Sequence, residues 1–205
     1  DGQSNYEYTK ESYLKEIAYV AQKPTLVQGS ISDNIMLYSN KKEDNFLNQY
    51  KNIFLGLKDG FDTQIGEGGI SLSGGQTALV ALARVANSNK NMVFLDEPTS
   101  GQDGNEKKKL ISLMHTLRYK GITVILVTHD MDIVASECTR VIVIADKHIV
   151  YDGSPMQLFE KEGNCERWGL ATPFSIALGK QLPHKPYCKN MQEFCSEYLK
   201  LKKKV

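Results

Sequence analysis

A serine, two glycines and a glutamine stand directly before a long apolar segment in LSGGQTALVALARV, residues 72–85. Ser73 and Gln76 have the spacing of a capping box, in which each side chain bonds the backbone N–H of the other residue. Gly74 and Gly75 leave the first turn open to a close approach, although each costs about 1 kcal/mol relative to alanine in a helix. Because free N–H groups and the helix dipole attract anions, the stretch predicts a phosphate-binding helix start. The alternative is a capped core helix that begins with glycines.

Two adjacent carboxylates follow the apolar run MVFL, residues 92–95. In an open α/β sheet, ligands bind at the carboxyl ends of the strands. Asp96 is therefore a candidate ligand of Mg²⁺, through its water shell. Glu97 is a candidate general base that orients and deprotonates an attacking water. The alternative is that both acids only cap the next helix.

Polar side chains follow two further apolar runs. Gln22 comes after EIAYV, residues 16–20, and its amide could ligate the metal and the water together. His129 comes after ITVILVT, residues 122–128, where it could contact a terminal phosphate. If these runs are neighbouring parallel strands, both side chains lie at the same edge of the sheet as the two carboxylates.

The elements that must position these side chains alternate between strands and helices. Short continuous apolar runs predict buried parallel strands at 16–20, 92–95 and 122–128. Helical patterns occupy 105–120 and 131–138. This alternation predicts an α/β fold with a largely parallel sheet.

An antiparallel hairpin is predicted where the runs 140–145 and 148–153 flank the short turn Asp146-Lys147.

Domain organisation is predicted from changes in pattern along the chain. Residues 31–87 show helical patterns without a strand signal, which predicts a helical insertion between core segments 1–30 and 88–163. Residues 164–205 contain a helix candidate at 190–204 and are predicted to form a small helical extension.

Charge and hydropathy exclude several classes of function. The chain has 25 basic and 24 acidic side chains, and this net charge of +1 gives no general attraction to nucleic acid. No run approaches the roughly 18 apolar residues of a membrane span. The four cysteines fit no standard zinc-site spacing.

Taken together, five motifs resemble those of ATP-binding-cassette (ABC) ATPases, in the order and at the spacing of that family. Gln22 resembles the Q-loop, residues 72–76 the signature motif and residues 93–98 the Walker B strand. SGQD, residues 100–103, resembles the D-loop, and His129 resembles the switch histidine. The resemblance covers residues 16 to about 153.

The resemblance implies a RecA-like P-loop NTPase core with a helical subdomain. It also implies two cassettes that face each other head to tail around two ATP molecules with Mg²⁺. Glu97 and His129 would be catalytic, and Asp96 and Gln22 would hold the metal. The nucleotide-binding residues would be Gln22, Ser73, Gly74, Gly75, Gln76 and Asp103.

The phosphate loop G-x-x-x-x-G-K-[ST] does not occur in the sequence. Gly179-Lys180 is followed by Gln181 and has Phe174 in place of the first glycine. The family places this loop a few dozen residues before the Q-loop, so we expect a cassette without its first strands. Such a chain is predicted to have no appreciable ATPase activity alone. The alternative is a natural, non-catalytic half-cassette that donates its signature motif to a partner ATPase.

The resemblance favours a transporter motor, because SGQD differs from the sequence found in translation factors and no coiled-coil insertion occurs. Residues 21–35 and 60–76 resemble exporters, and the latter include the T-x-x-G-E-x-G segment that meets transmembrane coupling helices. Residues 121–134 and 149–160 resemble importers, including energy-coupling-factor importers. Residues 77–79, Thr-Ala-Leu, depart from the polar and basic residues of the family.

The expected partners are therefore a second cassette and transmembrane transporter domains, with no nucleic acid. The expected location is peripheral, on the cytoplasmic face of the cell (inner) membrane, with membrane contact through the transmembrane partner.

Overall fold

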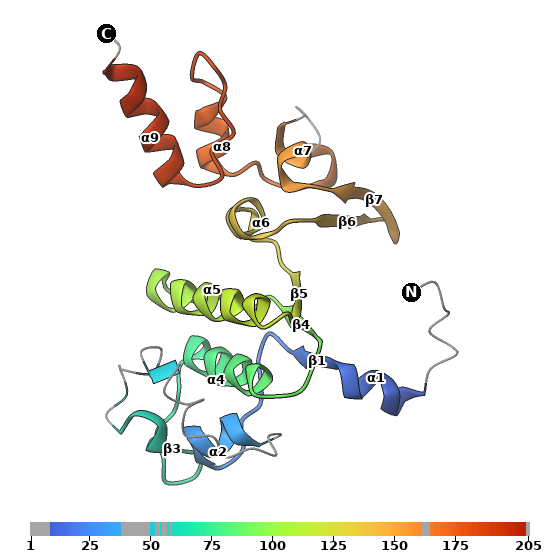
Figure 1. Cartoon of the computed structure of the whole chain (residues 1–205), viewed down its shortest axis with the longest axis vertical. Helices are drawn as coiled ribbons and strands as arrows, with labels where there is room; N and C mark the ends of the chain where they lie inside the picture. The colour runs from blue at the N-terminus through green and yellow to red at the C-terminus, as the bar shows by residue number, and fades with distance from the viewer. Residues whose placement is uncertain are drawn as a thin grey trace. The chain divides into compact units, whose positions relative to one another are not determined.

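The computed structural model describes residues 9–37, 50, 51, 54, 57, 59–160 and 165–203. The chain divides into two compact units, Asp1–Val127 and Thr128–Val205. Figure 1 shows both units, with labels on most of their helices and strands.

The first unit contains a three-stranded parallel sheet in the order β1-β4-β5. Its strands are β1 (Ile17–Val20), β4 (Met92–Asp96) and β5 (Thr123–Val127). The central strand β4 buries Val93 and Leu95 completely, which explains its continuous apolar sequence. The three predicted parallel strands and the α/β fold class are confirmed.

Two long helices, α4 and α5, supply most of the core of this unit. They pack against each other, and α4 also packs against α2. Most side chains of α4 are buried, because it has apolar neighbours on several sides. The helices of the unit, in chain order, are α1 (Lys10–Glu16), α2 (Ile31–Met36), the 3₁₀ helix η3 (Gly60–Asp62), α4 (Gly74–Ala86) and α5 (Gly104–Tyr119).

A short antiparallel pair joins β2 (Gly29–Ser30) to β3 (Gln64–Ile65). The pairing continues where the Ile31 N–H donates to the Thr63 carbonyl at 3.1 Å. The prediction that residues 31–87 contain no strand was therefore wrong at β3. Strands of two residues are too short to show alternation in a sequence. Residues 38–49 of the predicted helical insertion lie outside the described residues.

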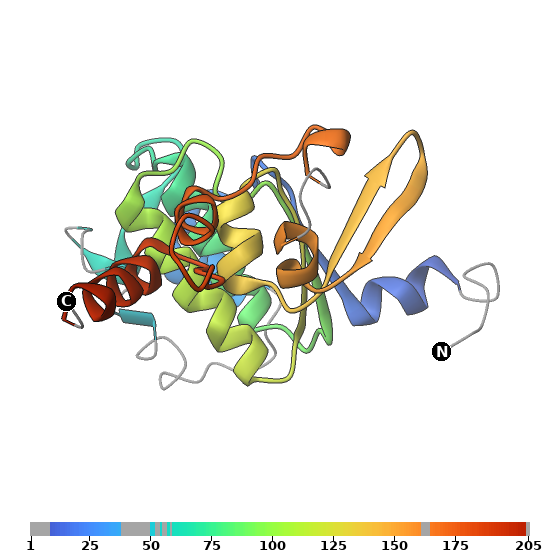
Figure 2. The ribbon, with the colours of Figure 1, turned by 90° about the horizontal axis from the view of Figure 1, so that it is seen from above.

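The second unit contains the predicted hairpin, β6 (Val141–Ala145) paired antiparallel with β7 (His148–Gly153). Asp146 and Lys147 have φ values of 49° and 66°, as a two-residue type I′ turn requires. Among the described residues this ribbon forms a sheet of its own, seen in light orange in Figure 2. The other elements are α6 (Met131–Glu137), α7 (Pro155–Glu160), the 3₁₀ helix η4 (Glu166–Trp168), α8 (Phe174–Gly179) and α9 (Met191–Lys202).

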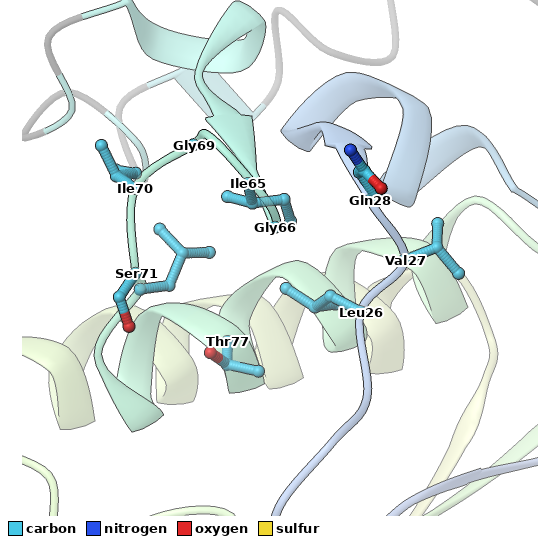
Figure 3. Close-up of a pocket in the computed structure, with 10 residues that line it drawn as sticks. Leu26, Val27, Gln28, Ile65, Gly66, Gly69, Ile70, Ser71 and Thr77 are labelled. Carbon is cyan, nitrogen blue, oxygen red and sulfur yellow. The ribbon is translucent and has the colours of Figure 1, made fainter.

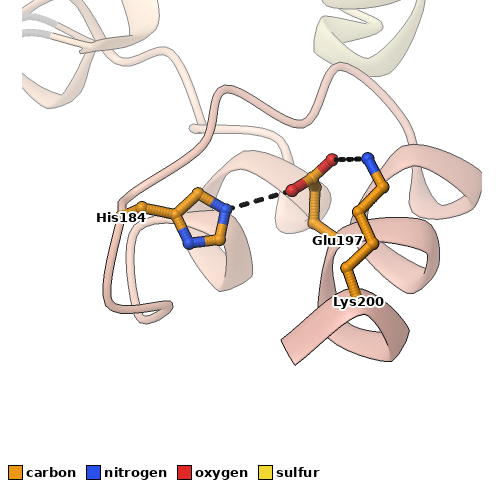
Figure 4. A network of polar contacts seen from close by, with 3 residues as sticks. All are labelled: His184, Glu197 and Lys200. Carbon is orange, nitrogen blue, oxygen red and sulfur yellow. Dashed lines mark hydrogen bonds and ion pairs between the residues drawn. The ribbon is translucent and has the colours of Figure 1, made fainter. Parts of the chain in front are cut away.

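The predicted helix near the C-terminus is present as α9, and an ion-pair network ties it to the preceding loop. The Lys200 ammonium donates to Glu197 Oε1 at 2.6 Å, and His184 Nε2 lies 3.0 Å from Glu197 Oε2 (Figure 4). These two bonds hold the pKa of the Glu197 carboxyl below its usual value. The network fixes the face of α9 that meets the loop after α8.

Tyr50 is expected to ionise well above the range of an ordinary tyrosine. Its side chain is 1% exposed, and burial raises the pKa of its phenol from 10.0 to about 12. Because the folded state holds this proton more tightly, its contribution to stability is complete below pH 10. We expect it to be lost as the pH rises toward 12, by up to about 1.4 kcal/mol per pH unit. Unfolding by urea at about pH 9 and about pH 11 measures this loss.

Tyr50→Phe is the matched variant, since it removes only the ionisable hydroxyl. It should unfold with a smaller alkaline loss of stability than the parent. The tyrosinate signal near pH 12 should fall by one tyrosine, because burial also raises the pKa of Tyr187 to about 12. An identical alkaline loss in both proteins would contradict the assignment.

Candidate functional site

The carboxyl ends of the three parallel strands lie at one edge of the sheet. Asp96, the last residue of β4, pairs with Val127, the last residue of β5. Gln22 follows β1 at the same edge, and its Nε2 donates to Ser100 Oγ at 3.3 Å. The structure thus brings the segment after β1 against the segment after β4, where Glu97 also lies. Ser100 was not predicted as a site residue, although it belongs to the SGQD motif.

Asp96 is held by a tyrosine that the sequence analysis missed. The Tyr19 hydroxyl of β1 donates to Asp96 Oδ2 at 2.9 Å. This hydrogen bond, together with partial burial and the Asp96 charge, raises the pKa of the Tyr19 phenol. Tyr19 is 65% exposed whereas the next residue, Val20, is buried, so their side chains lie on opposite faces of β1. The run 17–20 is apolar throughout, so no signal in the sequence singled out Tyr19.

The donor set at this edge fits Mg²⁺. Asp96, Gln22 and Ser100 offer carboxylate, amide and hydroxyl oxygens, which are the hard donors that this ion prefers. Gln22 and Ser100 are exposed and Asp96 is half-buried, so the site has room for the water molecules that Mg²⁺ retains. The two predicted metal ligands therefore lie at the same edge of the sheet and carry suitable atoms.

Glu97 stands in a strained backbone position directly after β4. Its φ is 44°, which non-glycine residues seldom adopt. Its N–H donates to the Val127 carbonyl at 2.8 Å, and its carbonyl accepts from the Ser100 N–H at 3.1 Å. Such strain persists only where the surrounding structure fixes it, and it is concentrated at functional sites. The direction of the Glu97 side chain is therefore set by a turn anchored to β5.

The start of α4 has the predicted capping box. The Gln76 N–H donates to Ser73 Oγ at 3.1 Å, and the Ser73 N–H donates to Gln76 Oε1 at 2.9 Å. Gly74 is exposed and Gly75 is buried. The capping geometry is confirmed, whereas the nucleotide-binding roles of these four residues stay predictions.

A carboxylate from α5 lies over this helix start. Ser73 Oγ donates to Glu106 Oε1 at 2.6 Å, and a Cβ atom built on Gly75 would lie 2.0 Å from Glu106 Oε2. Asp103, a predicted nucleotide ligand, is the N-cap of α5: its Oδ1 accepts the N–H groups of Asn105 and Glu106, both at 2.8 Å. Helix capping accounts for these bonds, and the nucleotide-binding role of Asp103 stays a prediction. The next helix is thus capped by Asp103, and not by Asp96 or Glu97 as the alternative for those two acids supposed. The spacing of Asp103 and Glu106 suits a capping box, yet Glu106 reaches Ser73 instead.

His129 lies two residues beyond Val127, the end of β5, and belongs to the second unit. The next residue, Asp130, caps α6 by accepting the Ile133 N–H at 3.2 Å. His129 thus precedes a capped helix by two residues, and its contact with a terminal phosphate stays a prediction.

A hollow of about 400 Å³ lies beside the first turns of α4 in the same unit. Figure 3 shows its walls, formed by the segment before β2, the turn after β3 and the start of α4. The lining is a mixture of apolar side chains and backbone, from Leu26, Val27, Gln28, Ile65, Gly66, Gly69, Ile70, Ser71, Leu72 and Thr77.

The described helices are all too short or too polar to cross a membrane.

Comparison with known proteins identifies this arrangement. Residues 1–100 match the family model described as ABC transporter. The chain is 34% identical over 163 residues to the ABC-type transmembrane transporter verA of Clonostachys rogersoniana, covering 75% of this chain and 13% of verA. It is 39% identical over 116 residues to the energy-coupling factor transporter ATP-binding protein EcfA2 of Streptococcus thermophilus, covering 57% of this chain and 41% of EcfA2. The chain thus spans less than half the length of these relatives.

A solved structure agrees with this likeness at the level of the fold. A bacterial Atm1-family ABC exporter with ATP bound superposes with a TM-score of 0.68 at 24% identity. The match covers 82% of this chain and 30% of the exporter chain. The RecA-like fold class predicted from the motifs is confirmed by this match. These matches identify the chain as part of an ABC transporter ATP-binding domain.

Proposed function

We propose that this chain serves as the ATP-hydrolysing motor of a membrane transporter. Two cassettes would close around Mg·ATP, and hydrolysis between them would drive movement of the cargo. The observation that carries the proposal is the gathering of Gln22, Asp96 and Glu97 at one edge of the sheet. The capped glycine helix start in the same unit supplies the face for the partner's nucleotide.

Each residue at the sheet edge has a proposed task. Asp96 and Gln22 would hold Mg²⁺, which when bound offsets the negative charge of the phosphates. Glu97 would accept a proton from the attacking water at its carboxylate, with its direction fixed by the turn at φ 44°. Tyr19 would orient the Asp96 carboxylate through its hydroxyl. His129 would contact the terminal phosphate.

The hollow beside α4 is the proposed docking site for a transmembrane domain. It contains part of the T-x-x-G-E-x-G segment, residues 63–69, and its mixed lining suits a short helix with one apolar face. Docking there would place the chain on the cytoplasmic face of the membrane as a peripheral subunit or domain. The proposal covers both directions of transport, because residues 60–76 resemble exporters and residues 121–134 resemble importers.

The 205-residue chain alone is expected to show no ATP turnover. The phosphate loop G-x-x-x-x-G-K-[ST] supplies most of the donors and the lysine charge that hold the β- and γ-phosphates, and the sequence does not contain it. Phosphate release at saturating Mg·ATP measures the activity. Multiple turnovers that Glu97→Gln abolishes would show that another part of the chain replaces the loop.

The proposed function itself is tested on a polypeptide that joins residues 1–205 to a preceding segment with the phosphate loop. We expect Mg·ATP to convert this polypeptide from monomer to dimer when Glu97→Gln blocks hydrolysis, measured by chromatography with light scattering. Ser73→Arg should abolish the dimer, and Ser73→Thr should retain it, because threonine can also cap the helix. Dimers that form equally well with Ser73→Arg would contradict the sandwich. They would equally contradict the alternative, a half-cassette that donates the same motif to a partner ATPase.

A further inference from the structure

The helix start that would meet a nucleotide already holds an anion from its own chain. Glu106 lies in the first turn of α5, and its Oε1 accepts the Ser73 hydroxyl proton at 2.6 Å. The same hydroxyl oxygen accepts the Gln76 N–H at 3.1 Å. Ser73 therefore has both its donor and an acceptor position in use. A phosphate oxygen can take the Ser73 proton only after Glu106 releases it.

The space over the helix start is occupied as well. A Cβ atom on Gly75 would lie 2.0 Å from Glu106 Oε2 and 2.5 Å from Glu106 Cδ, whereas on Gly74 it would meet nothing within 4 Å. The Glu106 side chain thus crosses directly over Gly75 and leaves Gly74 open. A carboxylate is well placed there, because the first turn of the 13-residue helix α4 carries partial positive charge.

We propose that Glu106 competes with nucleotide phosphate for Ser73 and the first turn of α4 and so lowers the affinity of this motif for phosphate. This inference rests on the proposed function, since it deepens the account of the same motif. A triphosphate and the Glu106 carboxylate have like charge, so they cannot share the helix start without repulsion. The backbone of Glu106 is fixed by the Asp103 cap at 2.8 Å, so release requires only rotation of its side chain. The motif of this chain therefore engages phosphate more weakly than the same motif without the carboxylate.

A purely structural role makes a different prediction. If Glu106 only ties α5 to α4, then Glu106→Gln should leave phosphate affinity unchanged, because the amide oxygen can still accept from Ser73. If Glu106 competes through its charge, the same variant should bind phosphate more tightly. Glu106 and glutamine have nearly the same shape, so the two roles separate cleanly.

The experiment uses the full 205-residue chain and sodium tripolyphosphate as the probe. Amide NMR signals of residues 73–76 are followed during titration of the parent, of Glu106→Gln and of Glu11→Gln. Glu11 is an exposed acid in the first turn of α1, so its variant matches the change in net charge. We expect half-saturation at a roughly two- to five-fold lower concentration in Glu106→Gln, as a charge at a helix terminus is typically worth. Glu11→Gln should titrate like the parent.

Other outcomes identify which idea fails. Equal half-saturation in the parent and Glu106→Gln overturns the competition and leaves phosphate binding by the motif intact. An equal gain in Glu106→Gln and Glu11→Gln also overturns it, because net charge would then explain the effect. If the signals of residues 73–76 move in none of the proteins, the motif does not bind phosphate and the proposed function fails together with the inference. If Glu106→Gln does not fold, the test is repeated with Glu106→Ser, which removes the charge and is too short to contact Ser73.

Discussion

Glu97→Gln is expected to lower ATP turnover by ~10²–10⁴-fold in a polypeptide that joins residues 1–205 to a phosphate-loop segment, the usual effect of removing a general base. The amide keeps the size of the side chain but cannot accept the proton of the attacking water. The fold should survive, since the bonds that hold the turn at φ 44° use the backbone of Glu97, its N–H to Val127 and its carbonyl to Ser100. Steady-state phosphate release measures the loss.

Nucleotide binding provides the control for this substitution. Glu97→Gln should bind Mg·ATP about as tightly as the parent, because Asp96, Gln22 and the phosphate loop remain. Glu11→Gln, an exposed acid-to-amide change on α1, should leave both turnover and binding unaltered. If Glu97→Gln lost binding in parallel with turnover, Glu97 would act as a ligand of the nucleotide or metal and not as the base.

The sequence was most informative where a structural signal is local. The three parallel strands were predictable because each is a continuous apolar run, and the hairpin because two such runs flank a two-residue turn. The capping box at Ser73 and Gln76 was predictable because its partners are three residues apart. The strand pair β2-β3 was missed, since two residues on each side leave no periodic pattern.

Contacts between distant segments could not be predicted in the same way. Tyr19 and Asp96 are 77 positions apart, and Ser73 and Glu106 are 33 positions apart. These contacts depend on strand register and on the packing of α4 against α5. Local sequence patterns predict neither of the two. Glu106 has the spacing of a capping box with Asp103, yet its carboxylate bonds Ser73 in another helix start. Tyr19 and Glu106, which bond residues of the motifs, were therefore harder to predict than the motif residues Asp96 and Ser73 themselves.

Asn34 makes a further set of contacts that no sequence motif predicted, and these link the segment after Gln22 to helix α4. Its side chain is fully buried. Oδ1 accepts from the Val27 N–H at 2.8 Å and from Arg84 Nη2 at 2.9 Å. Nδ2 donates to the carbonyls of Val27 and Ser30, at 2.9 and 3.0 Å. One amide therefore satisfies backbone groups of the loop and the guanidinium of α4 together.

Asn34→Ala is expected to lower the free energy of unfolding of the first unit by about 2–5 kcal/mol. An intramolecular hydrogen bond contributes about 0.5–1.5 kcal/mol net, and the substitution removes the four that the buried Asn34 side chain makes with Val27, Ser30 and Arg84. The Arg84 guanidinium keeps its bond from Nε to the Asn34 carbonyl at 2.7 Å, which limits the loss. Hydrogen exchange of α4 amides is the suitable measurement, because the single tryptophan, Trp168, reports on the second unit.

Asn105→Ala is the matched control for this loss. Asn105 is exposed in the first turn of α5, and its side chain makes none of the contacts that Asn34 makes, so the change should stay within about 0.5 kcal/mol. If protection of α4 fell equally in both variants, general sensitivity of the unit would explain the effect. If protection of the α4 amides fell only in Asn34→Ala, the Asn34 side-chain amide would be shown to hold the loop after Gln22 against α4.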